Sequence, residues 1–309
     1  MTGPRRPLPI LLPLLGAVFL LGLPRLRSDA ALRRADLGAR AATADMQQAA
    51  TAFLAGLSPG QRAKAMFDFD DPERLNWHFV PRPRRGLPLR EMTATQQHLA
   101  RGVLQAGLSA KGYRTASTIM ELESVLREMG ENPAVRDPAL YFVSIFGTPS
   151  REAPWGMRVE GHHLSLNITV VGDSLVATTP TFFGANPAEV RVGTGQGLRA
   201  LADEEDVARA LLGSLTESQR ARAVIRSASP GDIVTGNAVR VDPLSPVGIR
   251  VAELDPAQAT SLVRLLDVYL GRMPDSIAQR RRAALERSEL DQITFAWAGS
   301  AQRGEAHYY

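Results

Sequence analysis

The sequence has 309 residues, of which 44% are hydrophobic and 22% are charged. This composition is typical of a globular protein with a buried core, so general disorder is excluded. The formal net charge is +4, but seven arginines and two aspartates lie in the first 40 residues, which leaves 29 basic and 30 acidic residues beyond them. A nearly neutral body argues against nucleic-acid binding. The absence of cysteine excludes thiol catalysis, thiolate zinc sites and iron–sulfur clusters.

The N-terminus has the order of a secretory signal peptide. Arg5-Arg6 precede an uncharged run from Pro7 to Pro24, and the small-residue pattern Ser28-Asp29-Ala30 follows. The run is short for a membrane helix, which needs about 20 apolar residues. Residues 1–30 are therefore predicted to be a signal peptide for export to the periplasm or the medium. Because two arginines follow the run directly, a retained N-terminal anchor is the alternative, and only then would the protein contact a membrane.

Four predicted helix starts share one pattern, in which an apolar residue precedes a Ser, Thr or Asp and a Gln follows three positions later. The short polar side chain can accept hydrogen bonds from the first helix amides, and the Gln can reach back to the capping residue. The pairs are Ser58 and Gln61, Thr93 and Gln96, Thr216 and Gln219, and Asp255 and Gln258. The longest matches, LSPGQRAKAM and LTESQRARAV, are interpreted as shared capping chemistry rather than as an internal duplication.

In chain order, residues 31–45 are predicted to be a linker and residues 46–309 a single domain. Helices are predicted at about 42–56, 59–68, 93–108, 117–130, 203–213, 216–227, 256–271 and 275–288. The segment 78–90 contains three prolines and should lie extended over the surface. Strands are predicted at 140–147, 155–171, 174–183, 188–193 and 292–298, with a hairpin turn at Gly172-Asp173. Because helices and strands cluster separately, the predicted fold is α+β, with helical segments packed on a mainly antiparallel β-sheet.

The end of the sequence, FAWAGSAQRGEAHYY, is predicted to be a strand, a turn and the start of a returning strand. A hairpin that stops there would leave an unpaired aromatic edge, which native proteins avoid. The natural protein is therefore expected to continue past Tyr309.

The alternation of polar and apolar residues changes phase within RVEGHHLSLNITVV, residues 158–171. One continuous strand can change its buried face only if a residue is inserted, so a β-bulge is predicted near Gly161. The bulge would place a single polar row on one face of the sheet. That row consists of Arg158, Glu160, His163, Ser165, Asn167 and Thr169, with Thr178 opposite Asn167 on the next strand.

A carboxylate, an imidazole and an amide in one row form an acid–base pair or part of a metal-ligand set. Glu160, His163 and Asn167 are therefore candidate catalytic residues, and His162 is assigned a structural role as a buried imidazole. Such a set would suit a divalent metal, with His163 and His307 as ligands. The alternative is that the row is the wet face of a half-buried sheet. The candidate ligand-binding residues are Arg158, Ser165, Thr178, Trp77 and His78.

Four segments carry a resemblance to a known family: RLNWHFVPRPRRGLPL (74–89), PWGMRVEGHHLSLN (154–167), TPTFFGANPAEV (179–190) and the terminal HYY. Over most of residues 45–309 the chain resembles the bacterial family called domain of unknown function 3500. The resemblance implies no established activity. Members of that family continue with a strand and a segment rich in His, Asn and Asp, which implies that ligands of a site around His163 would be missing here.

Two functional hypotheses remain open from the sequence. The first is an exported enzyme, metal-assisted or hydrolytic, with a cleft lined by His, Glu and Asn. The second is an exported module without catalysis that binds a small molecule or an envelope component. An enzyme requires that the polar row faces a pocket, whereas a binding module allows the row to face open water.

Overall fold

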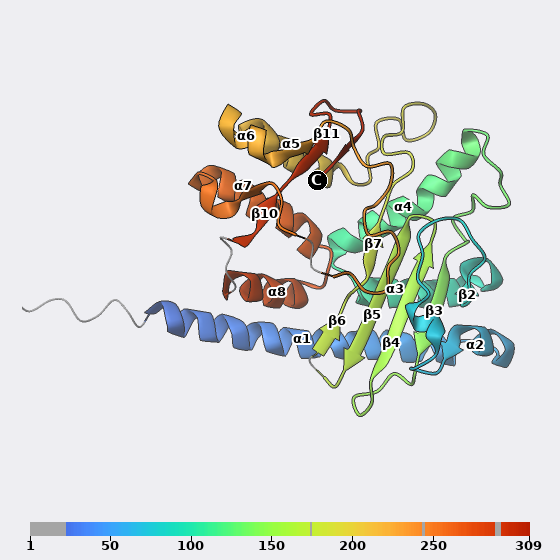
Figure 1. The fold of residues 1–309 in the computed structure, drawn as a ribbon. Coiled ribbons are helices and arrows are strands. Elements are labelled where there is room, and N and C mark those ends of the chain that lie inside the picture. Colours follow the sequence, from blue (N-terminus) through green and yellow to red (C-terminus); the bar gives the residue numbers. More distant parts are fainter. Residues whose placement is uncertain (1–22, 174, 243–244, 288–291) are drawn as a thin grey trace, which may run out of the picture.

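The computed structural model describes residues 23–173, 175–242, 245–287 and 292–309 (Figure 1). The predicted fold class is confirmed: the protein is α+β, with helices packed on mainly antiparallel sheets. The predicted signal peptide lies mostly outside the described residues. Residues 31–45 are not a separate linker, because they belong to the continuous helix α1 (Leu23–Ala55). Among the described residues, no helix is both long enough and apolar enough to span a membrane.

The main sheet has the strand order β1-β3-β4-β5-β6, with β2 also paired to β3 and β7 to β5. All pairs are antiparallel except β1 with β3. The predicted strand at 174–183 is divided into β6 and β7, and no strand forms at 188–193. The strands are β1 (Met66–Phe67), β2 (Leu87–Pro88), β3 (Phe142–Phe146), β4 (Trp155–Gly161), β5 (Leu164–Val171), β6 (Leu175–Ala177) and β7 (Thr181–Phe183).

The predicted bulge near Gly161 is wrong, because the chain reverses direction there. Gly161 pairs with Leu164, so His162 and His163 form a two-residue hairpin turn between β4 and β5. His163 has a φ of +57°, and His is among the few residues that adopt such a conformation more readily than most. The alternation of polar and apolar residues changes phase at Gly161 because the chain reverses direction between β4 and β5. Gly161 itself does not have a positive φ; a Cβ there would overlap the ring of Tyr141.

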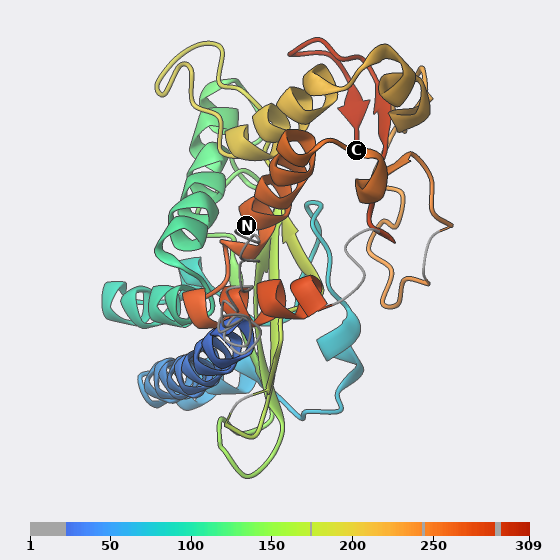
Figure 2. The same ribbon diagram turned by 90° about the vertical axis from the view of Figure 1, so that its left-hand side faces the viewer.

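The two faces of the main sheet are covered differently. Met157, Val159, Leu166 and Ile168 project from the β4–β5 hairpin into the core beneath α1, α3 (Ala94–Ala106) and α4 (Ala110–Glu128). Figure 2 shows these helices on one side of the sheet and the extended segment that precedes β2 on the other. We call residues 68–86 the covering segment; it includes the 3-10 helix η1 (Pro72–Leu75). The predicted extended course of residues 78–90 is confirmed as far as Pro88, after which a 3-10 helix begins at Leu89.

The predicted capping boxes all form. Ser58, Thr93, Thr216 and Asp255 each accept a hydrogen bond from the amide three residues later, and each following Gln bonds back to the capping amide. The helices α2 (Pro59–Ala65) and α6 (Glu217–Ala223) end earlier than predicted, because the chain passes directly into strands. Helix α4 begins earlier than predicted, with Ser109 as its capping residue.

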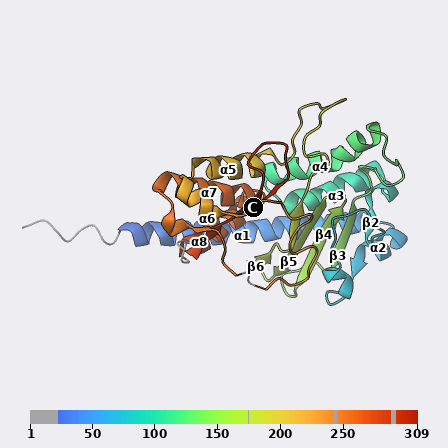
Figure 3. The same cartoon turned by 45° about the horizontal axis from the view of Figure 1, so that its top comes forward.

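A second group of elements packs beside the main sheet (Figure 3). Three of its helices surround a separate apolar cluster that includes Leu211, Leu262, Phe295 and Trp297, whereas the fourth, α8, buries Ile277 in the core of the main sheet. The elements are α5 (Ala202–Ser214), α6, β8 (Val224–Arg226), β9 (Ile249–Arg250), the 3-10 helix η3 (Val251–Glu253), α7 (Pro256–Leu270), α8 (Asp275–Arg287), β10 (Thr294–Phe295), β11 (Trp297–Gly299) and β12 (His307–Tyr308).

Candidate ligand-binding cavity

Four side chains of the predicted polar row share one face of the sheet, but they are buried. Arg158 pairs with Asn167, and Glu160 pairs with Ser165, across the β4–β5 hairpin. All four residues are buried, and the most exposed of them, Asn167, has an exposed fraction of 8%. The covering segment lies over this face, so the row is neither the wet face nor the open cleft that the sequence suggested.

The row is held by a buried network of charges. The Arg158 guanidinium donates from Nη2 to Glu73 Oε1 over 2.5 Å, and its Nε lies 3.1 Å from Glu160 Oε1. Glu160 also accepts a 3.2 Å hydrogen bond from the His78 amide. Burial raises the pKa of Glu160, although Arg158 and Arg84 act in the opposite direction. Opposite charges that are paired out of water clamp the covering segment onto the sheet.

Trp77 and His78, predicted to bind ligand, instead help to anchor the covering segment. Trp77 is 6% exposed and packs against Phe79 and Phe182, with ring centroids 6.1 and 6.5 Å away. His78 Nδ1 accepts a 2.9 Å hydrogen bond from the Phe79 amide. Burial, reinforced by Arg82 and Arg84, lowers the pKa of His78. These contacts anchor the covering segment to the domain through its aromatic residues.

Asn167 and Thr178 are not opposite each other. The loop between Val171 and Leu175 has three residues rather than two, which shifts the register of β6 and leaves Thr178 beyond its last pair, Thr169 with Ala177. Asn167 instead donates to Ser165 Oγ over 3.0 Å and to the Pro180 carbonyl over 2.9 Å. The first hydrogen bond lies within β5, and the second ties β5 to the loop that precedes β7.

His163 lies beneath the covering segment. Its amide donates to the Phe79 carbonyl over 2.7 Å, and its ring packs against that of His162 with centroids 4.0 Å apart. His163 Nδ1 is buried and has no hydrogen-bond partner among the described residues. Burial, with His162 and Arg136 nearby, lowers the pKa of His163 to about 4. The imidazole is therefore neutral at neutral pH and makes no contact typical of an acid–base group.

The predicted pair of metal ligands is not brought together. His307 lies on β12 in the three-stranded sheet β12-β11-β8, whereas His163 ends the β4–β5 hairpin of the main sheet. The His307 ring stacks on Trp297 with centroids 5.0 Å apart. Within the described part of the chain, no three His, Cys, Asp or Glu residues gather as metal ligands would.

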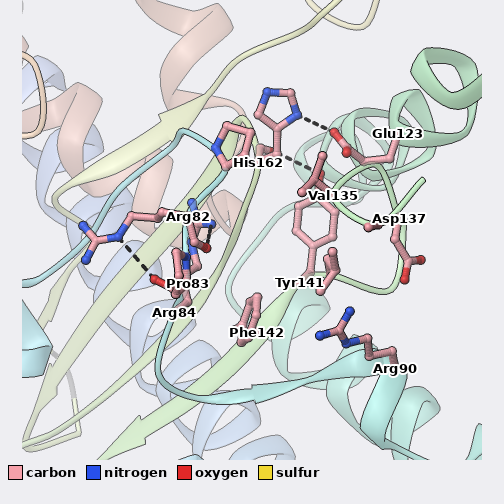
Figure 4. Close-up of a pocket in the computed structure, with 13 residues that line it drawn as sticks. Arg82, Pro83, Arg84, Arg90, Glu123, Val135, Asp137, Tyr141, Phe142 and His162 are labelled. Carbon is pink, nitrogen blue, oxygen red and sulfur yellow. Dashed lines mark hydrogen bonds and ion pairs between the residues drawn. The ribbon is translucent and has the colours of Figure 1, made fainter. Parts of the chain in front are cut away.

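A cavity of about 450 Å³ opens beside the hairpin turn (Figure 4). Its walls come from the covering segment, from α4, and from the loop and strand at residues 134–142. Apolar groups form much of the lining, and five charged residues and a histidine add polarity. The lining consists of Pro81, Arg82, Pro83, Arg84, Arg90, Glu123, Ala134, Val135, Asp137, Leu140, Tyr141, Phe142 and His162.

One end of the cavity holds a buried cluster of polar side chains. Glu123, which is 2% exposed, contacts His162 Nδ1 through Oε1. Arg136 Nη1 lies 3.0 Å from His162 Nδ1 and 3.3 Å from Nε2, and 3.9 Å from Glu123 Oε2. A proton on Nδ1 would let the imidazole donate to the carboxylate and accept from the guanidinium. The prediction that His162 is buried and hydrogen-bonded is confirmed, but His162 also faces the cavity.

The opposite end of the cavity carries Arg90, whose guanidinium points inward in Figure 4. The Arg90 side chain makes no hydrogen bond or ion pair with any other described residue. Arg84 is different, because its Nη2 donates to the carbonyls of His78, Val80 and Gly161. Tyr141 lies between the two ends and donates to the His162 carbonyl over 2.8 Å. Arg90 is therefore the cavity cation that is free to bind an anion.

Glu123, Arg136, Tyr141 and Arg90 are not among the residues predicted from the sequence. One signal was present: Glu123 interrupts the apolar side of α4, where Ile119, Met120 and Leu126 are buried. A carboxylate on the buried face of a helix requires a partner. That partner, His162, is 39 residues away in the sequence. The pattern predicts a buried pair without identifying its second member.

Comparison with known protein families matches residues 39–309 to the family described as "Protein of unknown function (DUF3500)". The chain belongs to this family. The DUF3500 match includes the covering segment, the β4–β5 hairpin and every residue that lines the cavity. The resemblance seen in the sequence motifs is thereby confirmed. Neither the curated proteins nor the solved structures contain a match to the chain.

Proposed function

We propose that the protein is exported and binds a small organic anion in the cavity beside His162. The observation that carries the proposal is the exposed, unpaired Arg90 guanidinium, which points into a half-open, partly apolar cavity. A guanidinium presents several donors in one plane and suits a carboxylate. Small-molecule sites are commonly concave, mostly apolar and equipped with a few polar groups.

The charges around the cavity favour an anion at the Arg90 end. Arg82, Arg84 and Arg90 oppose Glu123 and Asp137, which gives the lining one excess positive charge. Glu123 is occupied by His162 and Arg136 at the far end. Val135, Leu140 and Phe142 would contact the apolar body of the ligand. A molecule with one carboxylate and an apolar ring or chain therefore matches this lining best.

A hydrolytic enzyme is the second candidate, and the contact between Glu123 and His162 favours it. A carboxylate that orients an imidazole is a common arrangement for a general base. A base also needs a free lone pair, however, and Arg136 lies close to both ring nitrogens of His162. Binding without catalysis is therefore the better match. Hydrolysis of 4-nitrophenyl acetate that is abolished by His162→Asn would favour the enzyme instead.

Calorimetric titration of the full chain with benzoate tests the binding proposal. We expect saturable binding at neutral pH and a loss of about tenfold to a hundredfold in affinity for Arg90→Ala, because a hydrogen bond to a charged group contributes about 1.5–3 kcal/mol. Benzamide, which has the same ring without the charge, should bind weakly to both proteins. Arg151→Ala changes an exposed arginine outside the cavity and should bind as the wild type does. Equal benzoate affinity in Arg90→Ala, or no binding of benzoate or hexanoate to the wild type, would contradict the proposal.

The export part of the proposal rests on the N-terminal sequence alone. The basic pair and the apolar run predict that the secretion machinery recognises the chain and removes about 30 residues. Mass spectrometry of the protein from a cell that expresses the full gene should find a new N-terminus near Ala30 or Ala31. An intact Met1 on protein that remains in the cytoplasm would show that the segment is not an export signal.

A further inference from the structure

A second cavity adjoins the cavity beside His162. It has a volume of about 450 Å³, and it shares Pro83, Arg84, Arg90 and Phe142 with the first cavity. Arg84, Arg90 and Phe142 are labelled in Figure 4. The rest of the lining of the second cavity comes from α2, β1 and residues 85–91. A ligand that binds Arg90 in the first cavity can therefore extend into the second.

The second cavity is more positively charged than the first. Lys64, Arg84, Arg85 and Arg90 line it together with the carboxylate of Glu91, which gives an excess of three positive charges. Lys64 Nζ donates to Glu91 Oε2 over 2.5 Å, so these two charges neutralise each other. Arg84 is occupied by the three carbonyls to which it donates. Arg85 and Arg90 are therefore the cations that can bind an anion in this cavity.

The Arg85 guanidinium has donors left for a ligand. Its Nη1 lies 3.6 Å from Asp71 Oδ1, which is too long for a hydrogen bond, and the Arg85 side chain is 61% exposed. The guanidinium lies over the Phe67 ring, 4.6 Å from the ring centroid. In the described part of the chain, the Arg85 side chain donates no hydrogen bond. Because stacking on a ring leaves the edge of the guanidinium free, this edge can bind a carboxylate.

The second group of elements contains the same local structure as the part of the chain that carries Arg85 and Arg90. The first frame consists of α2, β1, β2, η2 (Leu89–Glu91) and α3, and the second frame of α6, β8, β9, η3 and α7. Gln61 and Gln96 exchange amide hydrogen bonds of 3.0 and 2.9 Å, and Gln219 and Gln258 exchange two of 2.9 Å. Capping alone does not require such bonds between separate helices, so the interpretation of the shared sequence pattern as capping chemistry alone is wrong.

Two glycines show which residues of the frames correspond. Gly86 and Gly248 have φ values of 106° and 90°, and they directly precede β2 and β9. Arg85 and Val247 therefore correspond, because each lies just before its glycine. Arg90 corresponds to Ala252, since they directly precede Glu91 and Glu253 at the ends of η2 and η3. The second frame forms with apolar side chains at both positions, so neither arginine is needed to build the frame.

The ion pair between Lys64 and Glu91 differs from Arg85 and Arg90 in this respect. Its counterpart in the second frame is the ion pair between Arg222 and Glu253. A charge pair that occurs in both frames belongs to the structure that they share. The positive charges of Arg85 and Arg90 are specific to the frame that borders the two cavities, which indicates a role in ligand binding.

We propose that the ligand is a dicarboxylate with an apolar substituent. The substituent occupies the first cavity, one carboxylate binds Arg90, and the other carboxylate binds Arg85 in the second cavity. This inference rests on the proposed function and adds a second acidic group to the ligand of the same site. A carboxylate and a guanidinium form charge-assisted hydrogen bonds, which are stronger than those between neutral groups, so the second carboxylate should add affinity.

Calorimetric titration of the full chain with benzylsuccinate and 4-phenylbutanoate tests this inference, because the two probes differ by one carboxylate. The diacid should bind about fivefold or more tightly than the monoacid. The longer diacid 2-benzylglutarate tests a wider separation of the two carboxylates. Arg85→Val introduces the residue of the second frame, so the frame should still form. This variant should lose the preference for diacids and bind 4-phenylbutanoate as the wild type does.

Three further variants complete the experiment. Arg85→Lys keeps the positive charge and should keep most of the preference for diacids. Arg90→Ala should weaken the binding of all three probes. Arg151→Val changes an exposed arginine outside both cavities and should leave every affinity unchanged.

The outcomes separate this inference from the proposed function. If the wild type binds 4-phenylbutanoate at least as tightly as both diacids, or if Arg85→Val retains the full preference for diacids, the second carboxylate site is wrong and the anion site at Arg90 still stands. If none of the three probes binds to the wild type, both the proposed function and this inference are wrong.

Discussion

Replacement of Arg158 by Met is expected to lower the free energy of unfolding by about 3–5 kcal/mol, because it leaves two carboxylates buried without their cation. Arg158 is 1% exposed and contacts both Glu73 and Glu160. Met can occupy the space of the aliphatic stem but cannot pair with either charge. Urea denaturation at pH 7, followed by circular dichroism, measures the loss. Arg85→Met removes an exposed partner of Asp71 and should cost less than about 1 kcal/mol.

A triple variant separates the loss of charge pairing from the loss of packing. When Glu73→Gln and Glu160→Gln are added to Arg158→Met, both unpaired carboxylates are removed. Most of the stability should return, because Arg84, which loses its ion pair with Glu160, keeps its hydrogen bonds to the carbonyls of His78, Val80 and Gly161. In the single variant, loss of Arg158 removes an influence that lowers the pKa of Glu160, so this raised pKa rises further. The folded variant then binds the proton more tightly than the unfolded chain, so the stability deficit of the variant relative to the wild type should become smaller as the pH falls toward 4.5. Equal stability of the single variant and the wild type would show that the network is not a clamp.

The second large effect is an acid-dependent loss of stability caused by His163. Its pKa is about 4 in the folded protein, against an ordinary value of 6.5. Between these values the unfolded chain binds a proton that the folded protein excludes, so stability is complete above pH 6.5 and decreases as the pH falls toward 4. The difference of about 2.5 pH units corresponds to roughly 3 kcal/mol. His163 was predicted from the sequence to be a catalytic residue of a cleft, and the fold instead buries its ring beneath the covering segment.

His163→Asn removes the titrating ring and keeps a residue that tolerates a positive φ. Unfolding free energies of the wild type and the variant, measured by urea denaturation from pH 7 to pH 4, should diverge as the pH falls, with the wild type losing about 3 kcal/mol relative to the variant. His98→Asn, at an exposed site on α3, should retain the acid-dependent loss of the wild type. Parallel pH profiles for the wild type and His163→Asn would mean that the imidazole is not desolvated as the fold indicates.

Features of the fold that depend on contacts between residues close in the sequence were predicted correctly. The capping boxes at Ser58 and Thr216 depend on contacts within one helical turn, and they form as predicted. The polar alternation of the segment around Gly161 identified four residues that share one face, although its cause is a turn rather than a bulge. A β-bulge and a hairpin turn produce the same change of phase in the sequence. In both cases the polar residues before and after the change lie on the same face of the sheet.

The cavity could not be predicted in this way. Glu123 and His162 are on different elements, and the contact between them depends on how α4 packs against the end of the β4–β5 hairpin. Whether the Arg90 guanidinium forms an ion pair likewise depends on which side chains the fold brings next to it. The same holds for the polar row. Its composition indicated a solvent-exposed face or a cleft, but the covering segment buries it.

By itself the sequence determined the four capped helix starts and the shared face of the hairpin, because these depend on contacts within a turn or on strand alternation. The grouping of helices and strands indicated the fold class, and the sequence motifs indicated the family. Tertiary structure alone decided that the polar row is a buried network of charges and that His162 rather than His163 faces the cavity. The physical reason is that burial, charge pairing and long-range register are properties of neighbours that meet in space. A buried carboxylate such as Glu123 indicates that a partner exists, and only the fold brings His162 to it.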